Sequence, residues 1–431
     1  MKNILITALL LLTCLTHAQV EESSEKWQKI DSLEILGLVE SADELTKDLI
    51  ASAKQKEDHL NFLKAKIYHY KFHQIRHENS TNYILNDLND VIEKVPAPYE
   101  NILLSYKASF LEQYFQEIRW KSRNRSTIDN PDSGDLETWS LHNLQDSIQS
   151  IFEKSLKQEK ELISTFTGEV ETLLNPNYLN RQFKPTLFDV LAHRAIEYYS
   201  NTSNFTTPKP QGFFSLNSPE LYSPTPDFAS FPFPEASKNT STVKVLKIYQ
   251  KLEKLHLEER NTLPLIFAQL SRLQYVNDNY SASDKWQLFN TALDRLKKRY
   301  KNKQGTSLIL VTRALDLYER SIVTDEEGKL ENPDFLKQAL YLAEKITNDY
   351  PNTDAAQRAY QLISAITAVK LDAKIPQTLS PKEPGRVYIS YKALDSLEIK
   401  IFQIPENFPS LAHLQKKRFN NPGNHSKRTA F

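Results

Sequence analysis

Residues 335–369 read FLKQALYLAEKITNDYPNTDAAQRAYQLISAITAV, and this stretch decides the fold class. Its apolar residues recur every three or four positions on both sides of a polar turn at 349–352, which predicts two amphipathic helices. The predicted inner faces consist of Ala339, Leu340, Ala343 and Ile346 in the first helix and Ala355, Ala359, Leu362, Ile363 and Ile366 in the second. Because alanines let two helices approach closely, the stretch predicts a helical hairpin.

The helical period extends outward from this hairpin over residues 22 to 370, where β-type alternation is rare. Turn-forming clusters interrupt it at 79–81, 96–98, 130–134, 175–177 and 332–334. The hairpin resembles a tetratricopeptide repeat, and the other units match that pattern only loosely. We therefore predict a mainly α protein in which 19–376 form an irregular tetratricopeptide-like α-solenoid, whose repeats bury their apolar faces by stacking on neighbours.

Composition excludes several enzyme classes. Only 8 of 431 residues are glycine, and none are spaced as dinucleotide-binding loops, P-loops or nucleophile elbows require. The single cysteine is Cys14 and the single methionine is Met1, which excludes disulfide frameworks, cysteine-ligated metals and cysteine nucleophiles downstream of residue 14. The scarcity of glycine also fits a chain of helices, because glycine destabilises a helix by about 1 kcal/mol relative to alanine.

Net charge gives no indication of an anionic polymer as partner. Lysine plus arginine and aspartate plus glutamate both total 54, so the net charge is 0. A chain without a global positive field is not expected to bind nucleic acid. With 40% hydrophobic and 25% charged residues, the sequence is typical of a folded soluble protein.

The first 18 residues have the pattern of a secretory signal peptide. Lys2 precedes an apolar run from Ile4 to Leu15, and Thr16-His17-Ala18 supplies small residues at −3 and −1. We expect cleavage after Ala18 and export to the periplasm, the cell envelope or the medium. The alternative is a lipid anchor on Cys14, and membrane association is expected only in that case.

A proline- and phenylalanine-rich segment interrupts the helical pattern at 205–237. Seven of the 21 prolines lie between Pro208 and Pro234. Proline prevents helix continuation and phenylalanine favours burial, so we expect an extended loop pressed onto the solenoid. A partner-docking loop is the alternative.

Near Pro376 the apolar period changes to two. Val387, Ile389 and Tyr391 alternate with polar residues, a turn is expected at 393–396, and Leu397, Ile399 and Ile401 alternate again. This pattern predicts an incomplete β hairpin at 377–405, the start of a β-sandwich. Residues 406–431 are polar and basic and are expected to form a disordered tail.

Three polar groupings were weighed as sites, and each favours a structural interpretation. His69, His73 and His77 share a predicted helix face, but the outer two lie too far apart for three ligands to meet at one ion, which leaves inter-helix histidines or an incidental two-histidine metal site. The basic cluster Arg119, Lys121, Arg123 and Arg125 with Trp120 is expected to be a charged helix end. Glu258-Glu259 and Asp325-Glu326-Glu327 lie in polar, turn-like stretches without the burial that a general acid needs. We therefore predict no catalytic, cofactor-binding or metal-binding residue.

Residues 185–199, PTLFDVLAHRAIEYY, form a predicted amphipathic helix. Its buried side comprises Leu187, Val190, Leu191, Ala195 and Tyr198. Thr186 is expected to be the N-cap, and His193 and Arg194 are expected to bond a neighbouring helix. The segment resembles a Pro-Thr-Leu-Tyr-Asp-Phe-Leu-Ala-His-Arg-Ala-Leu-like signature in the N-terminal helical region of large bacterial alpha-2-macroglobulin-like proteins. Residues 387–402, VYISYKALDSLEIKIF, resemble the opening strands of their first macroglobulin-type β domain.

The resemblance implies an envelope protein of a protease-trapping family, in which cleavage of a bait segment collapses a multidomain shell and a thioester captures the protease. This chain has no cysteine after residue 14 and no recognisable bait segment, so no functional residue carries over. We expect it to correspond to the N-terminal piece of such a protein, truncated at the first macroglobulin-type β domain.

These observations give two hypotheses of function. The first is a non-enzymatic exported scaffold, whose expected partners are proteins: the remaining macroglobulin domains and the trapped proteases. The second is an outer-membrane protein that binds glycans or other nutrients on helical repeats. The second hypothesis predicts a lipidated Cys14 and an exposed aromatic platform.

Overall fold

The computed structural model describes residues 24–119, 135–174, 180–205, 214–374, 384–392, 394 and 396–400. Its contacts divide the chain into two units, Met1–Ala359 and Tyr360–Phe431. Both the predicted signal peptide at 1–18 and the predicted tail at 406–431 lie outside the described residues.

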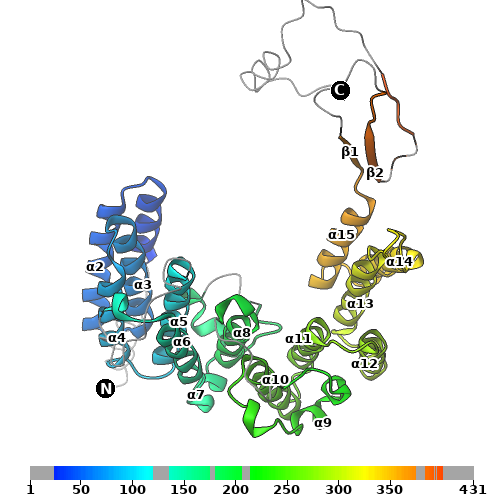
Figure 1. The fold of residues 1–431 in the computed structure, drawn as a ribbon. Helices are drawn as coiled ribbons and strands as arrows, with labels where there is room; N and C mark the ends of the chain where they lie inside the picture. Colours follow the sequence, from blue (N-terminus) through cyan, green and yellow to red (C-terminus); the bar gives the residue numbers. More distant parts are fainter. Residues whose placement is uncertain are drawn as a thin grey trace, which may run out of the picture. The chain divides into compact units, whose positions relative to one another are not determined.

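The described part of the chain is mainly helical (Figure 1). A first helical segment covers 24–35. The α-helices that follow are α2 (Val39–Gln55), α3 (His59–Arg76), α4 (Thr81–Ile92), α5 (Tyr99–Ile118), α6 (Leu141–Ser155), α7 (Glu159–Ser164), α8 (Leu187–Ser200), α9 (Thr225–Ala229), α10 (Ser241–Glu258), α11 (Thr262–Asn279), α12 (Lys285–Arg299), α13 (Thr306–Ser321), α14 (Pro333–Asp349) and α15 (Asp354–Thr367). Short 3₁₀ helices are η1 (Leu136–Thr138), η2 (Thr167–Glu169), η3 (Glu171–Leu173), η5 (Thr202–Asn204), η6 (Pro219–Tyr222) and η7 (Glu235–Ser237), and the strands are β1 (Lys370–Lys374) and β2 (Tyr388–Lys392).

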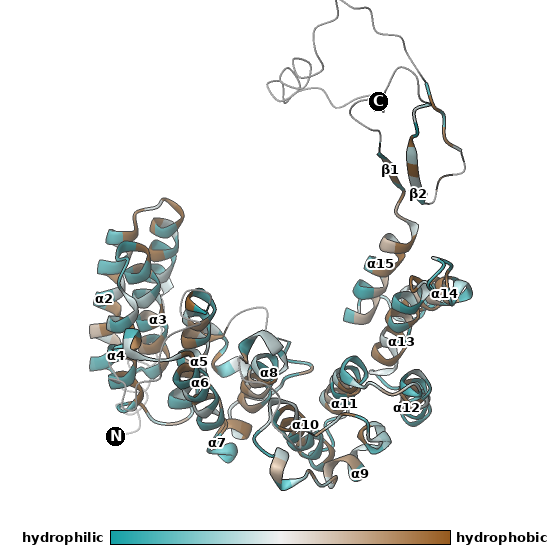
Figure 2. Cartoon of the chain, viewed as in Figure 1, coloured by the Kyte–Doolittle hydropathy of each residue, from teal (hydrophilic) through white to brown (hydrophobic). Residues whose placement is uncertain are grey.

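Helices in the first unit pack mainly on their neighbours in the sequence, which confirms the α-solenoid. The tightest pairs are α2 with α3, α5 with α6, α10 with α11, and α13 with α14, and α8 connects α5 and α6 to α10. Figure 2 shows apolar and polar residues mixed along the helices, as amphipathic helices require. Each helix thus buries its apolar face against the next, and the core runs along the chain of helices.

The two helices predicted from residues 335–369 are present as α14 and α15, and α14 packs mainly on α13. Ala339, Ala343 and Ile346 are fully buried on α14. On α15 the buried residues are Ala355, Ala356, Ala359, Leu362 and Ile366, while Leu340 and Ile363 are partly buried. The turn clusters at 79–81, 96–98 and 332–334 lie where α4, α5 and α14 begin, as predicted. The clusters at 130–134 and 175–177 fall outside the described residues.

The segment 205–237 is more ordered than the extended loop that the sequence predicted. Within its described part, 214–237, the chain forms η6, α9 and η7, and prolines occupy the first turns of η6 and α9, where no backbone donor is needed. Leu221, Tyr222 and Phe228 are buried. The predicted packing onto the solenoid is therefore confirmed, whereas the extended conformation was wrong.

The β hairpin was predicted with the wrong partner strand. Residues 388–392 do form a strand, but β2 pairs antiparallel with β1, with Leu371 opposite Tyr391 and Ala373 opposite Ile389. Residues 396–400 form no strand. The pairing therefore uses residues shortly after α15, whereas residues 393, 395 and 401–405 of the expected turn and second strand lie outside the described residues.

Candidate functional site

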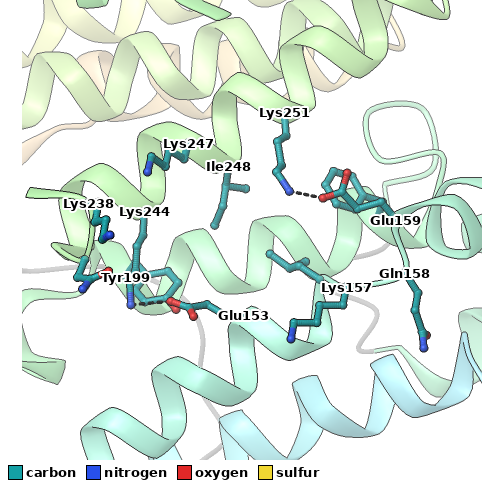
Figure 3. A pocket seen from close by; sticks show the side chains of 13 residues that line it. Glu153, Lys157, Gln158, Glu159, Tyr199, Lys238, Lys244, Lys247, Ile248 and Lys251 are labelled. Carbon is teal, nitrogen blue, oxygen red and sulfur yellow. Dashed lines mark hydrogen bonds and ion pairs between the residues drawn. The ribbon is translucent and has the colours of Figure 1, made fainter. Parts of the chain in front are cut away.

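A cavity of about 620 Å³ lies within the first unit. Its walls come from the end of α6, the α6–α7 turn, α8 and α10 (Figure 3). The lining residues are Glu153, Leu156, Lys157, Gln158, Glu159, Phe188, Tyr199, Lys238, Asn239, Lys244, Lys247, Ile248 and Lys251. Five lysines against two glutamates make this a cationic cavity in a chain whose net charge is 0.

One wall is a single face of α10. Lys244, Lys247 and Lys251 follow at intervals of three and four residues, with Ile248 between them, so all four side chains lie on the same side of the helix. Figure 3 shows Lys244 and Lys251 reaching across to Glu153 and Glu159 on the opposite wall. Ile248 is buried, whereas Lys247 is exposed. The face therefore has an apolar base and a charged rim.

Lys244 is held in place by three groups. Its Nζ donates to Gln149 Oε1 (2.9 Å) and pairs with Glu153 Oε1 (2.7 Å). It also lies 5.2 Å from the centroid of the Tyr199 ring. Burial raises the pKa of Tyr199, so its hydroxyl stays protonated and donates to the backbone oxygen of Gln149 (3.1 Å). Lys244 therefore fixes the wall between α6 and α10.

The opposite wall is a turn stabilised from behind by α5. After α6 ends at Ser155, Gln158 adopts a left-handed backbone with φ of 59° and starts α7. The buried Asn101 of α5 donates from Nδ2 to the backbone oxygens of Ser155 (3.1 Å) and Lys157 (2.9 Å). These two bonds fix the turn that carries Lys157. Glu159 then pairs with Lys251 across the cavity.

The floor belongs to α8, the helix of the 185–199 block. Thr186 is its N-cap, as predicted, and forms a capping box with Asp189. All five residues of the predicted buried side are buried. Phe188, which is 2% exposed, and Tyr199 present their inner edges to the cavity.

The two polar residues of this block have different partners. Arg194 bonds α5 as predicted, through Ser109 Oγ (2.8 Å) and the backbone oxygen of Ser105 (3.4 Å). His193 does not bond a neighbouring helix, because its Nδ1 lies 2.8 Å from the backbone oxygen of Asp189 on its own helix. The expectation for His193 was therefore wrong.

Buried ionisable groups elsewhere are bonded within the core. Asp189 Oδ1 lies 2.6 Å from His256 Nε2, and both side chains are 1% exposed. Glu253 pairs with Arg272 at 2.6 Å, and Arg272 also donates to the backbone of residues 221 and 223. These contacts connect α8 to α10, and α11 to the proline-rich segment. All four side chains are buried.

Two histidines of the α3 face contact neighbouring helices. His69 Nδ1 lies 2.6 Å from the buried Asp43 Oδ1 of α2, and the His73 ring stacks on Tyr83 of α4. Burial works against the Asp43 charge, but the bonds from His69 and Lys47 keep its pKa below the ordinary value. Within the described ranges no group of three or more histidine, cysteine, aspartate or glutamate side chains could hold a metal ion.

The remaining groupings do not meet at a site. Arg119 donates to the backbone oxygen of Ser203, and the rest of its basic cluster lies outside the described residues. Glu259 accepts from Asn261, and Asp325 accepts the backbone N–H groups of Glu327 and Lys329 in a turn.

Sequence analysis did not identify the cationic cavity. The signal was available in Lys244, Lys247 and Lys251, whose spacing places three positive charges on one helix face. Lys157 carries no such signal, because its place in the cavity depends on the turn held by Asn101.

Two further comparisons complete the description. Among the described residues no helix is both long enough and apolar enough to cross a membrane. The chain matches no protein-family model, no curated protein and no solved structure.

Proposed function

We propose that this chain is a non-enzymatic, exported helical-repeat scaffold that belongs to an alpha-2-macroglobulin-like envelope protein and presents a β edge to further β-structure. The observation that carries the proposal is the exposed sheet of β1 and β2. All five residues of β1 are exposed, and Leu371, Tyr388 and Tyr391 are 46%, 66% and 63% exposed.

A two-stranded sheet with exposed Leu371, Tyr388 and Tyr391 favours a partner. Two strands alone are marginally stable in water, and sheet edges with apolar side chains pair readily with other strands. Lys392 donates to the backbone oxygen of Ala365 at the end of α15 (2.8 Å), which stabilises the sheet at one point. A macroglobulin-type β domain would cover the exposed side chains and extend the edge.

The non-enzymatic part of the proposal rests on where the ionisable groups lie. The buried pairs Asp189–His256 and Glu253–Arg272 are engaged with each other and with the backbone. The cavity is lined by lysines and glutamates whose arrangement provides neither a nucleophile with a base nor an oriented acid pair. Turnover by the purified chain in a broad hydrolase panel would contradict this part.

Photo-cross-linking in the native host tests the scaffold. A photoreactive phenylalanine derivative replaces Tyr391 in the full exported chain, and the matched control carries it at Tyr341 of α14, which is 64% exposed. We expect position 391 to cross-link to a macroglobulin-type β segment identified by mass spectrometry, and position 341 not to do so. Identical products from both positions, or none from 391, would refute the proposal.

The second candidate is glycan binding, which one surface pair favours. Trp286 of α12 is 38% exposed and stacks on Phe335 with ring centroids 5.5 Å apart. Partly exposed stacked rings can pack against sugar faces. A glycan array with the wild type and Trp286→Ala tests this candidate. If it is correct, the wild type binds a sugar and the variant does not.

A further inference from the structure

We propose that the cavity between α6, α7, α8 and α10 binds a small organic phosphate or sulfate ester, with Lys157 and Lys247 as its main cationic contacts. The proposal concerns a ligand site in the first unit and does not depend on the scaffold function. It is carried by which lysines are engaged, by the shape of the cavity and by the charge of its walls.

The five lysines fall into three groups. Lys244 is saturated by Gln149, Glu153 and the Tyr199 ring. Lys238 and Lys251 pair with the exposed Glu235 and Glu159, and such surface pairs exchange partners at little cost. Neither Lys157 nor Lys247 lies within ion-pair distance of a carboxylate among the described residues, and Glu235, which pairs with Lys238, is the carboxylate that Lys247 influences at longer range. These two ammonium groups are therefore available to an anion.

A row of lysines on a helix usually only faces solvent. The lysines of α10 differ because they line a cavity that has another lysine on its opposite wall. Lys157 stands on the opposite wall, on a turn that the buried Asn101 holds in place. Lys157 and the lysines of α10 line the same cavity from opposite walls. A bound oxyanion would interact favourably with positive charges on both walls.

The chemistry of the walls selects the class of ligand. Lysine ammonium groups are compact point charges that bind the oxygens of tetrahedral oxyanions such as phosphate, and no arginine lines the cavity. A volume of about 620 Å³ is far larger than an inorganic ion and falls in the range of small-molecule sites. Leu156, Phe188 and Ile248 give an apolar floor for an organic body.

Calorimetric titration of the full chain tests the proposal with three probes that share one sugar: glucose 6-phosphate, glucose 6-sulfate and glucose. We expect one or both esters to bind, glucose not to bind, and the affinity to fall as salt increases. The ester that binds more tightly shows whether the site prefers a phosphate or a sulfate group. Equal binding of glucose, or no binding of either ester, would overturn the proposal.

The first variant removes the two available charges. Lys157→Gln with Lys247→Gln is expected to weaken ester binding at least about tenfold, because both charge-assisted hydrogen bonds to the anion are lost. The control is Lys160→Gln with Lys298→Gln, which removes the same charge from exposed positions outside the cavity. We expect the control to bind like the wild type. An equal loss of ester affinity in both variants would indicate only general electrostatic attraction to a positively charged protein. That result would overturn the proposed binding site.

A second variant changes affinity in the opposite direction. Glu159→Gln removes a negative charge from the wall and frees Lys251, so ester binding is expected to tighten several-fold. A purely structural role of Glu159 would weaken binding or leave it unchanged, and either result would count against the proposal. Far-UV circular dichroism of each variant confirms that the helices are intact.

Discussion

His193 shows how burial sets the charge of one residue in the solenoid. Its ring contacts Phe267 of α11, and its Nδ1 faces the backbone oxygen of Asp189. Burial, with smaller contributions from Lys184 and His256, lowers the pKa of His193 from 6.5 to about 4, while Asp189 acts in the opposite direction. The folded protein therefore holds this histidine neutral.

Acid should destabilise the fold through His193. Between pH 6.5 and about 4 the unfolded chain binds a proton at this histidine that the folded chain does not. The stability associated with neutral His193 is therefore fully present above pH 6.5. As the pH falls towards 4, the free energy of unfolding decreases by about 3 kcal/mol in total. Urea unfolding at several pH values should show His193→Gln with a shallower pH dependence than the wild type. If the free energy of unfolding had the same pH dependence in both proteins, the acid destabilisation would not come from His193.

Glu253 and Arg272 form an ion pair inside the core. Their side chains are 0% and 2% exposed, so removing one charge leaves the other buried without its partner. We expect Glu253→Gln to cost about 3–5 kcal/mol of unfolding free energy. The control is Asp294→Asn, whose pair with Arg313 lies at the surface and should contribute less than about 1 kcal/mol. Urea midpoints measure both, and similar small losses would show that the buried pair is not coupled to stability.

At the scale of elements, α8 depends on its N-terminal cap. Thr186 Oγ1 accepts from the Asp189 backbone N–H, and Asp189 Oδ2 accepts from the Thr186 backbone N–H (3.0 Å). Thr186→Ala should lower stability by about 1–2 kcal/mol, because buried helix donors lose their acceptor. Thr186→Ser keeps the hydroxyl and should lose far less. Thermal unfolding compares the two variants, and equal losses would show that the methyl group matters more than the cap.

Helices were predictable from the sequence because their apolar period is local. The 185–199 block and the two helices of 335–369 were placed correctly from spacing alone. Strand pairing is not local: β2 was recognised from alternation, but its partner β1, Lys370–Lys374, has too few apolar residues to show a period. The cavity was missed for the same reason, since Lys157 and Lys247 are far apart in the sequence and meet only through helix packing.

At the scale of the first unit, the contacts are those of a one-dimensional stack. Helices α2 and α3 contact their near neighbours, as do α12 and α13. Local openings in such a stack should remain near the site of damage, because each interface is stabilised only by adjacent repeats. Denaturant would still unfold the stack cooperatively, whereas native-state exchange reports the local openings.

Two core truncations at opposite ends of this unit test the stack. Leu63 of α3 and Leu293 of α12 are both 0% exposed, and either change to alanine should cost about 2–5 kcal/mol. We expect Leu63→Ala to accelerate amide hydrogen exchange in α2 to α4 and Leu293→Ala to do so in α11 to α13. Each variant is the control for the other, because the chemical change and burial are matched and only the position differs. Uniform acceleration of all helices in both variants would mean that the unit opens as a whole, and the description as a stack of locally stabilised repeats would be wrong.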